Sequence, residues 1–269
     1  MKIGILTSVE TRHRYFVNAV RARFEVAAVA YEETGYSPAD VDARDLNRRE
    51  TGVLADHFAE RARQELIFFG AQADVLVDGP LSAVRHMRPG DLNSHDTLAF
   101  LESSGVDTVV VFGTNLIQAP LLERFAGRIV NLHLGLSPYY RGTGTNFYPL
   151  VNEEPQYVGA TIHVIDAGID SGPILAHARP EIVADDGPHT IGCKAIQAGI
   201  DKLLHVLPQW HDGRRTPVPQ WPISNARVYL RKDYHPLQVV ELYKKLESGM
   251  IARYVERVRH QPAGIRLIE

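Results

Sequence analysis

The chain has 269 residues, of which 45% are hydrophobic, and a formal net charge of −3 at pH 7. This length and apolar share suit one α/β domain with an appendage. The balanced charge excludes a chain that binds nucleic acid or acidic lipid through its overall charge. The single cysteine, Cys193, excludes an internal disulfide and an all-cysteine metal site, and we expect it to be a buried thiol.

No targeting or membrane segment is expected. The chain starts directly with a strand pattern, Lys2–Leu6, which is too short and too early for a signal peptide. The most apolar stretch, Val106–Phe112, is far shorter than the ~20 residues that cross a bilayer. We therefore expect a cytoplasmic protein without membrane contact.

The first half of the chain alternates strand and helix patterns. Near-continuous runs of Val, Ile and Leu predict buried strands at Lys2–Thr7, Val26–Tyr31 and Val106–Phe112, with a weaker signal at Asp74–Val77. Apolar residues at steps of three and four predict helices at Arg12–Arg23, Val53–Gly70, Asp96–Ser104 and Ala119–Phe125. Such alternation predicts an α/β fold with a Rossmann-like, mostly parallel sheet.

The pattern changes in the second half. Arg128–His133 predicts one further buried strand, whereas Gly159–Asp166 alternates between two faces. A tight loop then leads into a strand at Ile174–Ile182, so we expect an antiparallel pair at the edge of the parallel sheet. A helix over Thr190–Leu207 closes the core.

A crowded run of prolines, Pro217, Pro219 and Pro222, marks a boundary. We therefore divide the chain into a main domain, 1–215, and a small C-terminal appendage, 216–269. Residues 226–269 carry nine Lys and Arg against five Asp and Glu, and Pro236–Leu246 predicts a helix. We expect this tail to serve packing or the contact of a homodimer.

Asn131 and His133 carry the most specific chemical signal. Residues two apart on a strand share a face, and the end of a buried parallel strand is where such sheets bind ligands. An amide and a protonated imidazole can both donate to an oxygen that gains charge as a carbonyl turns tetrahedral. Asp170, on a glycine-flanked loop, is the candidate carboxylate that holds up the pKa of the imidazole. Taken alone, such a pair at the end of a strand is more often a hydrogen-bonded turn than a catalytic site, and Asp170 alone could cap a turn.

Three separated segments together resemble the folate-dependent formyltransferases, which include glycinamide ribonucleotide, methionyl-tRNA and sugar N-formyltransferases. The segments are Asn131–Pro138 with Arg141-Gly142, Gly159–His163, and Asp166–Ile174. The family has an Asn-x-His-x-Ser-Leu-Leu-Pro loop followed roughly 40 residues later by a Leu-Asp-x-Gly loop. The resemblance covers Lys2 to Arg214 in layout and is specific only from Phe112 to Ile174.

The resemblance implies transfer of a formyl group from N10-formyltetrahydrofolate to a primary amine, without a metal. Asn131 and His133 would polarise the formyl carbonyl, and Asp170 would pair with His133 and shuttle a proton. Two loops would hold the folate: Phe112, Gly113, Thr114, Asn115, Leu116 and Ile117, and facing them Ile165, Asp166, Ala167, Gly168 and Ile169.

The acceptor is inferred from departures from the family. The Ser of the family loop is Gly135 here, which affects loop shape more than the catalytic triad. In place of the Gly-Ser-rich phosphate loop of the purine enzyme, the chain has Thr7–Arg14, and its tail is too short and too helical for the basic barrel of the tRNA enzyme. We therefore expect a small-molecule amine acceptor, a nucleotide-linked amino sugar, rather than a nucleic acid. Its contacts would be Arg12, His13, Arg14, Tyr139, Tyr140, Arg141, Gly142 and Thr143, although residues 12–14 fit a solvated helix start equally well.

Other functions stay open at this point. A formyl-folate hydrolase, or transfer to an amino acid derivative, methionyl-tRNA or glycinamide ribonucleotide, is one alternative. A non-catalytic protein that binds folate or a nucleotide sugar is another.

Three further sequence signals are weaker. A Ser137-His133-Asp170 hydrolase triad lacks the Gly-x-Ser-x-Gly elbow. His133, His163 and His177 do not have metal-ligand spacing. In the tail, Arg231 and Lys232 beside two tyrosines give only a weak nucleic-acid signal.

Overall fold

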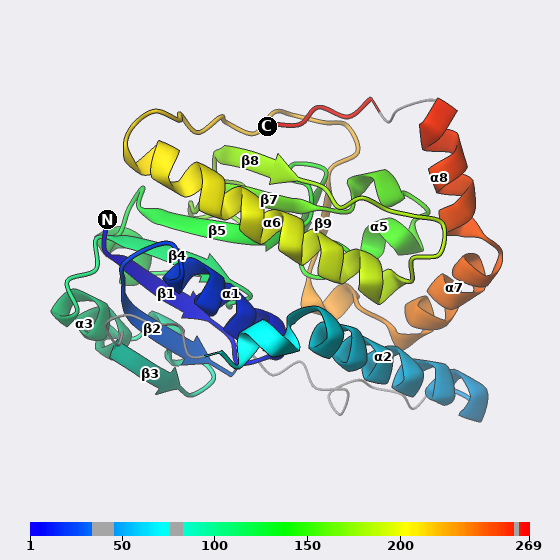
Figure 1. The fold of residues 1–269 in the computed structure, drawn as a ribbon, viewed down its shortest axis with the longest axis horizontal. Coiled ribbons are helices and arrows are strands. Elements are labelled where there is room, and N and C mark those ends of the chain that lie inside the picture. Colours follow the sequence, from blue (N-terminus) through cyan, green and yellow to red (C-terminus); the bar gives the residue numbers. More distant parts are fainter. Residues whose placement is uncertain (34–45, 76–82, 261–263) are drawn as a thin grey trace.

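The structure is a computed structural model that describes residues 1–33, 46–75, 83–260 and 264–269. Its centre is a seven-stranded sheet in the order β3-β2-β1-β4-β5-β7-β8 (Figure 1). The first five of these strands in that order run parallel. Their bounds are β3 Ala83–Met87, β2 Val26–Glu32, β1 Ile3–Thr7, β4 Thr108–Phe112 and β5 Ile129–Leu134.

The last two strands, β7 (Ala160–Val164) and β8 (Ile174–Ala178), are antiparallel to their neighbours. Every residue of both is buried, because α6 (Pro188–His211) packs across them and β5. The expected α/β class, with antiparallel strands at one edge of a mostly parallel sheet, is confirmed.

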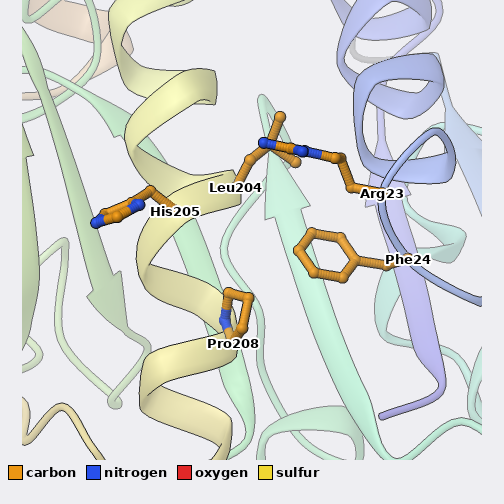
Figure 2. A pocket seen from close by; sticks show the side chains of 5 residues that line it. All are labelled: Arg23, Phe24, Leu204, His205 and Pro208. Atoms are coloured by element: carbon orange, nitrogen blue, oxygen red, sulfur yellow. The ribbon is translucent and has the colours of Figure 1, made fainter.

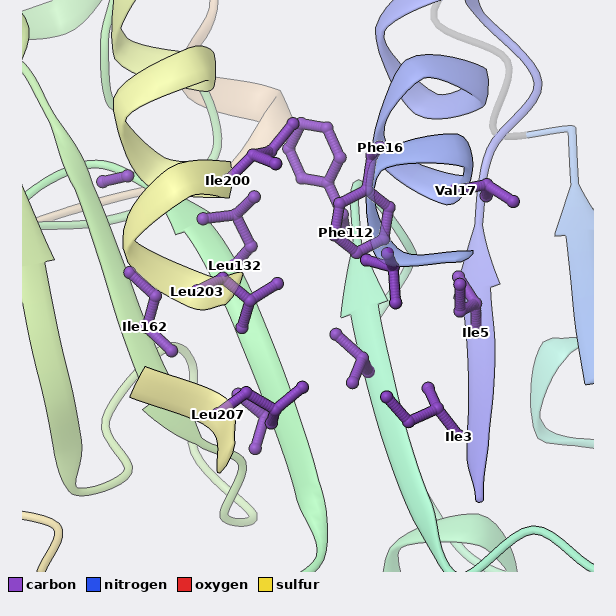
Figure 3. Packing of buried hydrophobic residues seen from close by; sticks show 14 of the residues in the cluster. Ile3, Ile5, Phe16, Val17, Phe112, Leu132, Ile162, Ile200, Leu203 and Leu207 are labelled. Carbon is purple, nitrogen blue, oxygen red and sulfur yellow. The ribbon is translucent and has the colours of Figure 1, made fainter. Parts of the chain in front are cut away.

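Helices cover both faces of the sheet. On one face, α1 (Thr11–Arg21), α2 (Arg48–Ala73) and α6 pack over the strands, and Ile200, Leu203 and Leu207 of α6 lie against β5 and β7 (Figure 3). On the other face, α3 (His95–Ser103) and α4 (Leu121–Arg124) bury Leu101 and Leu121 against the opposite side chains of the same strands. Strand residues alternate between the two cores, as a pleated strand requires.

The long helix α2 begins at a capping box. The side chain of Asn47 accepts hydrogen bonds from the backbone of Arg49 and Glu50, and Glu50 bonds back to the backbone of Asn47. This cap explains why α2 starts earlier than the apolar spacing predicts. It also runs to Ala73, so the weak strand expected at Asp74–Val77 is wrong at 74–75, where the helix ends, and at 76–77 lies outside the described residues.

The segment beyond the prolines returns to the main sheet. A short strand β9 (Arg227–Tyr229) pairs in parallel with β6 (Tyr140–Gly142), and Val218 bridges to Ile174. The tail ends in α7 (Pro236–Glu247) and α8 (Met250–His260), which pack on α5 (Tyr148–Val151) and the first part of α6. The sequence analysis predicted α7 but not α8. It also missed the β6–β9 pair, because each of these strands has only three residues.

Short 3-10 helices at Asp91–Asn93, Pro155–Tyr157 and Arg231–Asp233 complete the described elements. No helix among the described ranges is long and apolar enough to cross a membrane. A small open pocket between α1 and α6 is lined by Arg23, Phe24, Leu204, His205 and Pro208 (Figure 2). It shares no residue with the site described next.

Candidate active site

Three polar side chains meet near the carboxyl end of β5. Asn131 and His133 project to the same face of β5 as Ile129, because alternate residues of a strand share a face. Ile129 belongs to the core beneath α3 and α4, so Asn131 and His133 lie on that side of the sheet. The antiparallel register of β7 places His163 directly opposite Asn131. Directly opposed side chains are close enough to interact, and Asn131 Nδ2 lies 3.1 Å from His163 Nε2.

The carboxylate of Asp170 reaches all three of these side chains from the loop between β7 and β8. Its Oδ2 is 3.3 Å from His133 Nδ1, and its Oδ1 accepts a hydrogen bond from Asn131 Nδ2 at 3.2 Å. Oδ1 also lies 3.5 Å from His163 Nε2. The structure therefore brings together the three residues expected to act as one unit and adds His163, which the sequence placed in a strand without a role.

The Asp170 loop is held in an uncommon conformation. Asp170 has a φ of 45°, a left-handed value that residues other than glycine rarely adopt. Gln220 Nε2 donates to the backbone oxygens of both Asp170 and Gly172, at 2.7 and 2.9 Å, while the Gly142 N–H donates to Asp170 Oδ2 at 2.9 Å. These bonds fix the carboxylate, and Gln220 is a residue that the sequence analysis missed.

Burial sets the protonation of the pair. Desolvation lowers the pKa of His133 below 6.5, and the attraction of Asp170 offsets this only in part. Burial by itself would raise the pKa of Asp170, but the charges of His133 and His163, together with the hydrogen bonds from His163 and Gly142, hold it well below its usual range. Asp170 therefore holds up the pKa of His133 as expected, but burial outweighs this effect, so near neutral pH the carboxylate is ionised and the imidazole is neutral.

These side chains line a cavity of about 1000 Å³ that spans the carboxyl edge of the parallel strands. One end, on the α3 and α4 side, includes Asn93, Ile117 and Gln118. The other end lies on the opposite face of the sheet, among residues of α1, α2 and α6. A cavity of this size is at the upper end of the range for small-molecule sites, and the Asn131–Asp170 group stands between its two ends.

Both loops expected to hold a folate line this cavity. The residues are Phe112, Gly113, Thr114, Asn115, Leu116 and Ile117 after β4, and Ile165, Asp166, Ala167, Gly168 and Ile169 after β7. The first loop is anchored by Glu32, whose side chain accepts from the backbone of Gly90 and Leu92 and from Asn115 Nδ2, each within 3.1 Å. Glu32 is fully buried at the end of β2, and the sequence analysis missed it.

Gly113 is required by its neighbour on α1. It has a φ of 68°, and a Cβ there would lie 2.2 Å from His13 Nε2. The ring of His13 packs edge-on against Phe112 at 4.9 Å and pairs with Glu10 at 2.6 Å. Because burial lowers the pKa of His13 to about 4, this residue supports the loop as a neutral ring and brings no positive charge to an anionic acceptor.

The residues expected at the acceptor divide into two groups. Arg12, His13, Gly142 and Thr143 line the cavity, whereas Arg14, Tyr139, Tyr140 and Arg141 do not. Two side chains of this second group are engaged elsewhere: Arg14 donates to Asp74 at 3.2 Å, and the buried Tyr140 donates its hydroxyl to Glu154. Tyr139 bonds to the tail, through the backbone oxygen of Arg266.

The C-terminal tail forms part of the cavity wall, through Tyr229, Leu230, Arg231 and Tyr234. The ring of Tyr229 stacks on Tyr148 with centroids 3.6 Å apart, and Arg231 Nη2 donates to Asn115 Oδ1 at 3.1 Å. Gly142, with a φ of 88°, lies so close to β9 that a Cβ would be 2.0 Å from the Tyr229 oxygen. The tail is therefore a part of the site and not packing alone.

The glycine that replaces the family serine also has a steric reason. Gly135 has a φ of 147°, and a Cβ would lie 2.6 Å from Thr145 Cβ and 2.7 Å from His133 Nε2. Thr145 fills this space and places its own hydroxyl 3.4 Å from His133 Nε2. The hydroxyl of Thr145 thus stands beside the imidazole.

Two rival sites find no support. Ser137 is fully buried and does not line the cavity, so it has no access to a substrate as a hydrolase nucleophile. Within the described ranges, no group of three or more His, Cys, Asp or Glu side chains could hold a metal ion.

Comparison with known proteins defines the class. The family model "Formyl transferase" matches residues 55–207, more than half of the chain, and the chain therefore belongs to the formyl transferase family. Two similar relatives are methionyl-tRNA formyltransferases. That of Microcystis aeruginosa is 34% identical over 125 residues, which are 46% of this chain and 38% of the relative. That of Streptococcus agalactiae is 33% identical over 135 residues, 49% of this chain and 42% of the relative. The chain thus matches about two fifths of the length of these relatives.

Solved structures of this class share the fold. A sugar N-formyltransferase from a Shewanella species superimposes with a TM-score of 0.56 at 17% identity, over 87% of this chain and 78% of that one. Glycinamide ribonucleotide transformylase 1 from Symbiobacterium toebii gives a TM-score of 0.55 at 20% identity, over 81% and 94%. The resemblance drawn from the motifs of this chain is confirmed at the level of the family.

Proposed function

We propose that this protein transfers a formyl group from N10-formyltetrahydrofolate to a primary amine. The observation that carries the proposal is the contact of Asp170 with both Asn131 and His133, at 3.2 and 3.3 Å, inside a cavity of about 1000 Å³. An amide, a neutral imidazole and an ionised carboxylate around one point suit acyl transfer, which needs an oxyanion donor and a place for a proton.

The folate end of the cavity fits the carrier. The loop after β4, which includes the exposed Leu116, is anchored by Glu32 through Asn115, and the facing loop after β7 leads directly to Asp170. A wall that combines apolar side chains with a few polar groups is suited to a small heterocyclic ligand. When bound, the carrier supplies a formyl group that is already activated on nitrogen.

The protein's own groups would act as follows. The two N–H groups of Asn131 Nδ2 face Asp170 Oδ1 and His163 Nε2. The N–H that faces His163 would turn to the developing oxyanion, while the bond to Asp170 keeps the amide oriented. The neutral His133 accepts the proton that the amine gives up as the new C–N bond forms. A proton taken up at Nε2 is held by the backbone oxygen of Tyr140 at 3.2 Å, while Nδ1–H faces Asp170. His133 then returns the proton to the departing nitrogen, so that the reaction neither consumes nor releases protons.

For the acceptor we favour a nucleotide-linked amino sugar. The turn after β1 lacks the glycine-rich phosphate loop expected for glycinamide ribonucleotide and presents Arg12 to the cavity instead. A guanidinium is a good donor to phosphate oxygens.

Methionyl-tRNA is the second candidate acceptor. It is favoured by the similar relatives, which are methionyl-tRNA formyltransferases and match 46% and 49% of this chain.

The test combines carrier, acceptors and mass spectrometry. The protein is incubated with N10-formyltetrahydrofolate and a panel of nucleotide-linked amino sugars, glycinamide ribonucleotide or charged methionyl-tRNA, and the product is examined for the mass gain of one carbonyl unit. Formyl transfer gives an amide, whereas a hydrolase gives free formate. Carrier binding without either product, unchanged by His133→Ala, would identify a binding protein and refute the proposal.

A further inference from the structure

The end of the cavity away from the folate loops carries a compact charged cluster. Arg12 Nη1 and Arg61 Nε both contact Glu65 Oε1, at 2.7 and 3.1 Å. The side chains of Arg12 and Glu65 are 14% and 10% exposed, whereas that of Arg61 is 39% exposed. All three line the cavity, so one carboxylate holds two guanidinium groups next to each other at its wall.

Two histidines extend this cluster toward the start of α6. The rings of His57 and His189 lie 4.4 Å apart, and both line the cavity. His57 is 8% exposed, and within the described ranges its Nδ1 is buried without a hydrogen-bond partner. Burial lowers the pKa values of these two rings to about 3 and about 4, so both are neutral donors or acceptors at pH 7.

The first turn of α6 completes the arrangement. Pro188, His189 and Gly192 line the cavity at the beginning of a 24-residue helix, and the N-cap, Gly187, forms no side-chain cap hydrogen bond. The N-terminus of a helix favours negative charge. The unpartnered Nδ1 of His57 is a second and separate indication that a polar group belongs here.

At this end of the cavity wall, the guanidinium groups of Arg12 and Arg61 face the single carboxylate of Glu65. Glu10 Oε2 lies 3.9 Å from Arg12 Nη2 and 2.6 Å from His13, but Glu10 does not line the cavity. Guanidinium groups held side by side match the several oxygens of a phosphate group.

We infer that Arg12, Arg61 and His57, with the first turn of α6, form a subsite for a phosphate group of the acceptor. The inference rests on the proposed function and deepens it: the acceptor is a phosphorylated small molecule, and α2 contributes to its recognition. A cluster that only joined α1 to α2 would need neither the exposed Arg61 nor an unpaired nitrogen on His57 at the cavity wall.

The test measures the binding of inorganic pyrophosphate by calorimetry, without carrier or turnover. We expect Arg61→Gln to weaken binding at least about tenfold, because Arg61 is partly exposed and its loss leaves the Arg12–Glu65 pair intact. Glu65→Gln removes the competing carboxylate and should strengthen binding. Arg63→Gln is the matched control: Arg63 is on the same helix, pairs with Glu60 at the surface and does not line the cavity, so its variant should bind as the wild type does.

Equal binding by the wild type and Arg61→Gln, or an equal loss in Arg63→Gln, would overturn the subsite. Competition by uridine diphosphate and by glucose 1-phosphate then shows whether a nucleotide or a sugar supplies the phosphate. Competition by either compound supports the subsite if Arg61→Gln abolishes that competition. Because these measurements require no catalysis, failure here leaves the formyl-transfer proposal standing, and an inactive enzyme leaves the subsite standing.

Discussion

Replacing Asp170 by Asn tests the site most directly. The two side chains have nearly the same shape, and the Asn oxygen can still accept the Gly142 N–H that fixes the loop. The negative charge beside His133 is lost. A charge-assisted contact contributes about 1.5–3 kcal/mol, equivalent to about 10- to 150-fold, and loss of a working proton acceptor costs about 10²–10⁴-fold. We therefore expect kcat/KM to fall about 10²-fold or more.

The pH profile of the same variant gives an independent readout. Asp170 raises the pKa of His133 while burial lowers it more strongly. Without the carboxylate this pKa falls further, so the acidic limb of the rate profile should move to lower pH.

The assay follows tetrahydrofolate release with a fixed acceptor, and carrier affinity is measured separately. The control is Asp212→Asn, an exposed aspartate at the end of α6 that should keep wild-type activity. If Asp170→Asn retained a rate within about threefold of the wild type, with the pH profile unchanged, the carboxylate would have no part in catalysis.

Three further outcomes follow from the same geometry. Gln220→Leu removes two bonds to the Asp170 loop and should lower kcat about tenfold with little change in carrier affinity; a loss confined to KM would contradict a positioning role. Gly135→Ser, which restores the family residue, should lower both activity and melting temperature, because its Cβ would collide with Thr145 and the φ of 147° is unfavourable; urea unfolding should show about 1–3 kcal/mol lost. His57 has a folded-state pKa of about 3, so the unfolded chain binds its proton first as the pH falls below about 6.5, and stability is lost between there and about pH 3. His57→Phe should flatten this loss, which amounts to about 5 kcal/mol, and an unchanged slope in pH-dependent unfolding would refute it.

The sequence could predict the sheet and the catalytic group because both depend on short-range patterns. Buried strands appear as apolar runs, and Asn131 and His133 share a face at the end of one of them. The expected site contained Asp170 because a family motif supplied the pairing over 39 residues. His163 was within reach of the same reasoning, since an antiparallel β7 in register with β5 must place some residue opposite Asn131.

Other parts of the site depend on contacts that leave no local pattern. Glu32, Gln220 and the wall from Tyr229 to Tyr234 act over distances of 50 residues or more along the chain, through single hydrogen bonds and a three-residue strand. The neutral state of His133 was also out of reach, because it follows from the depth of burial and not from the residues that surround it in sequence.

The bond from Gln220 to the Asp170 loop has a consequence for the order of synthesis. The ribosome makes Asn131, His133 and Asp170 well before it makes Gln220, and the Tyr229–Tyr234 wall later still. A nascent chain that ends before residue 220 therefore contains Asn131, His133 and Asp170 but lacks the side chain that holds the Asp170 loop. Competence for catalysis should arise late during translation, when this last segment folds back over the sheet.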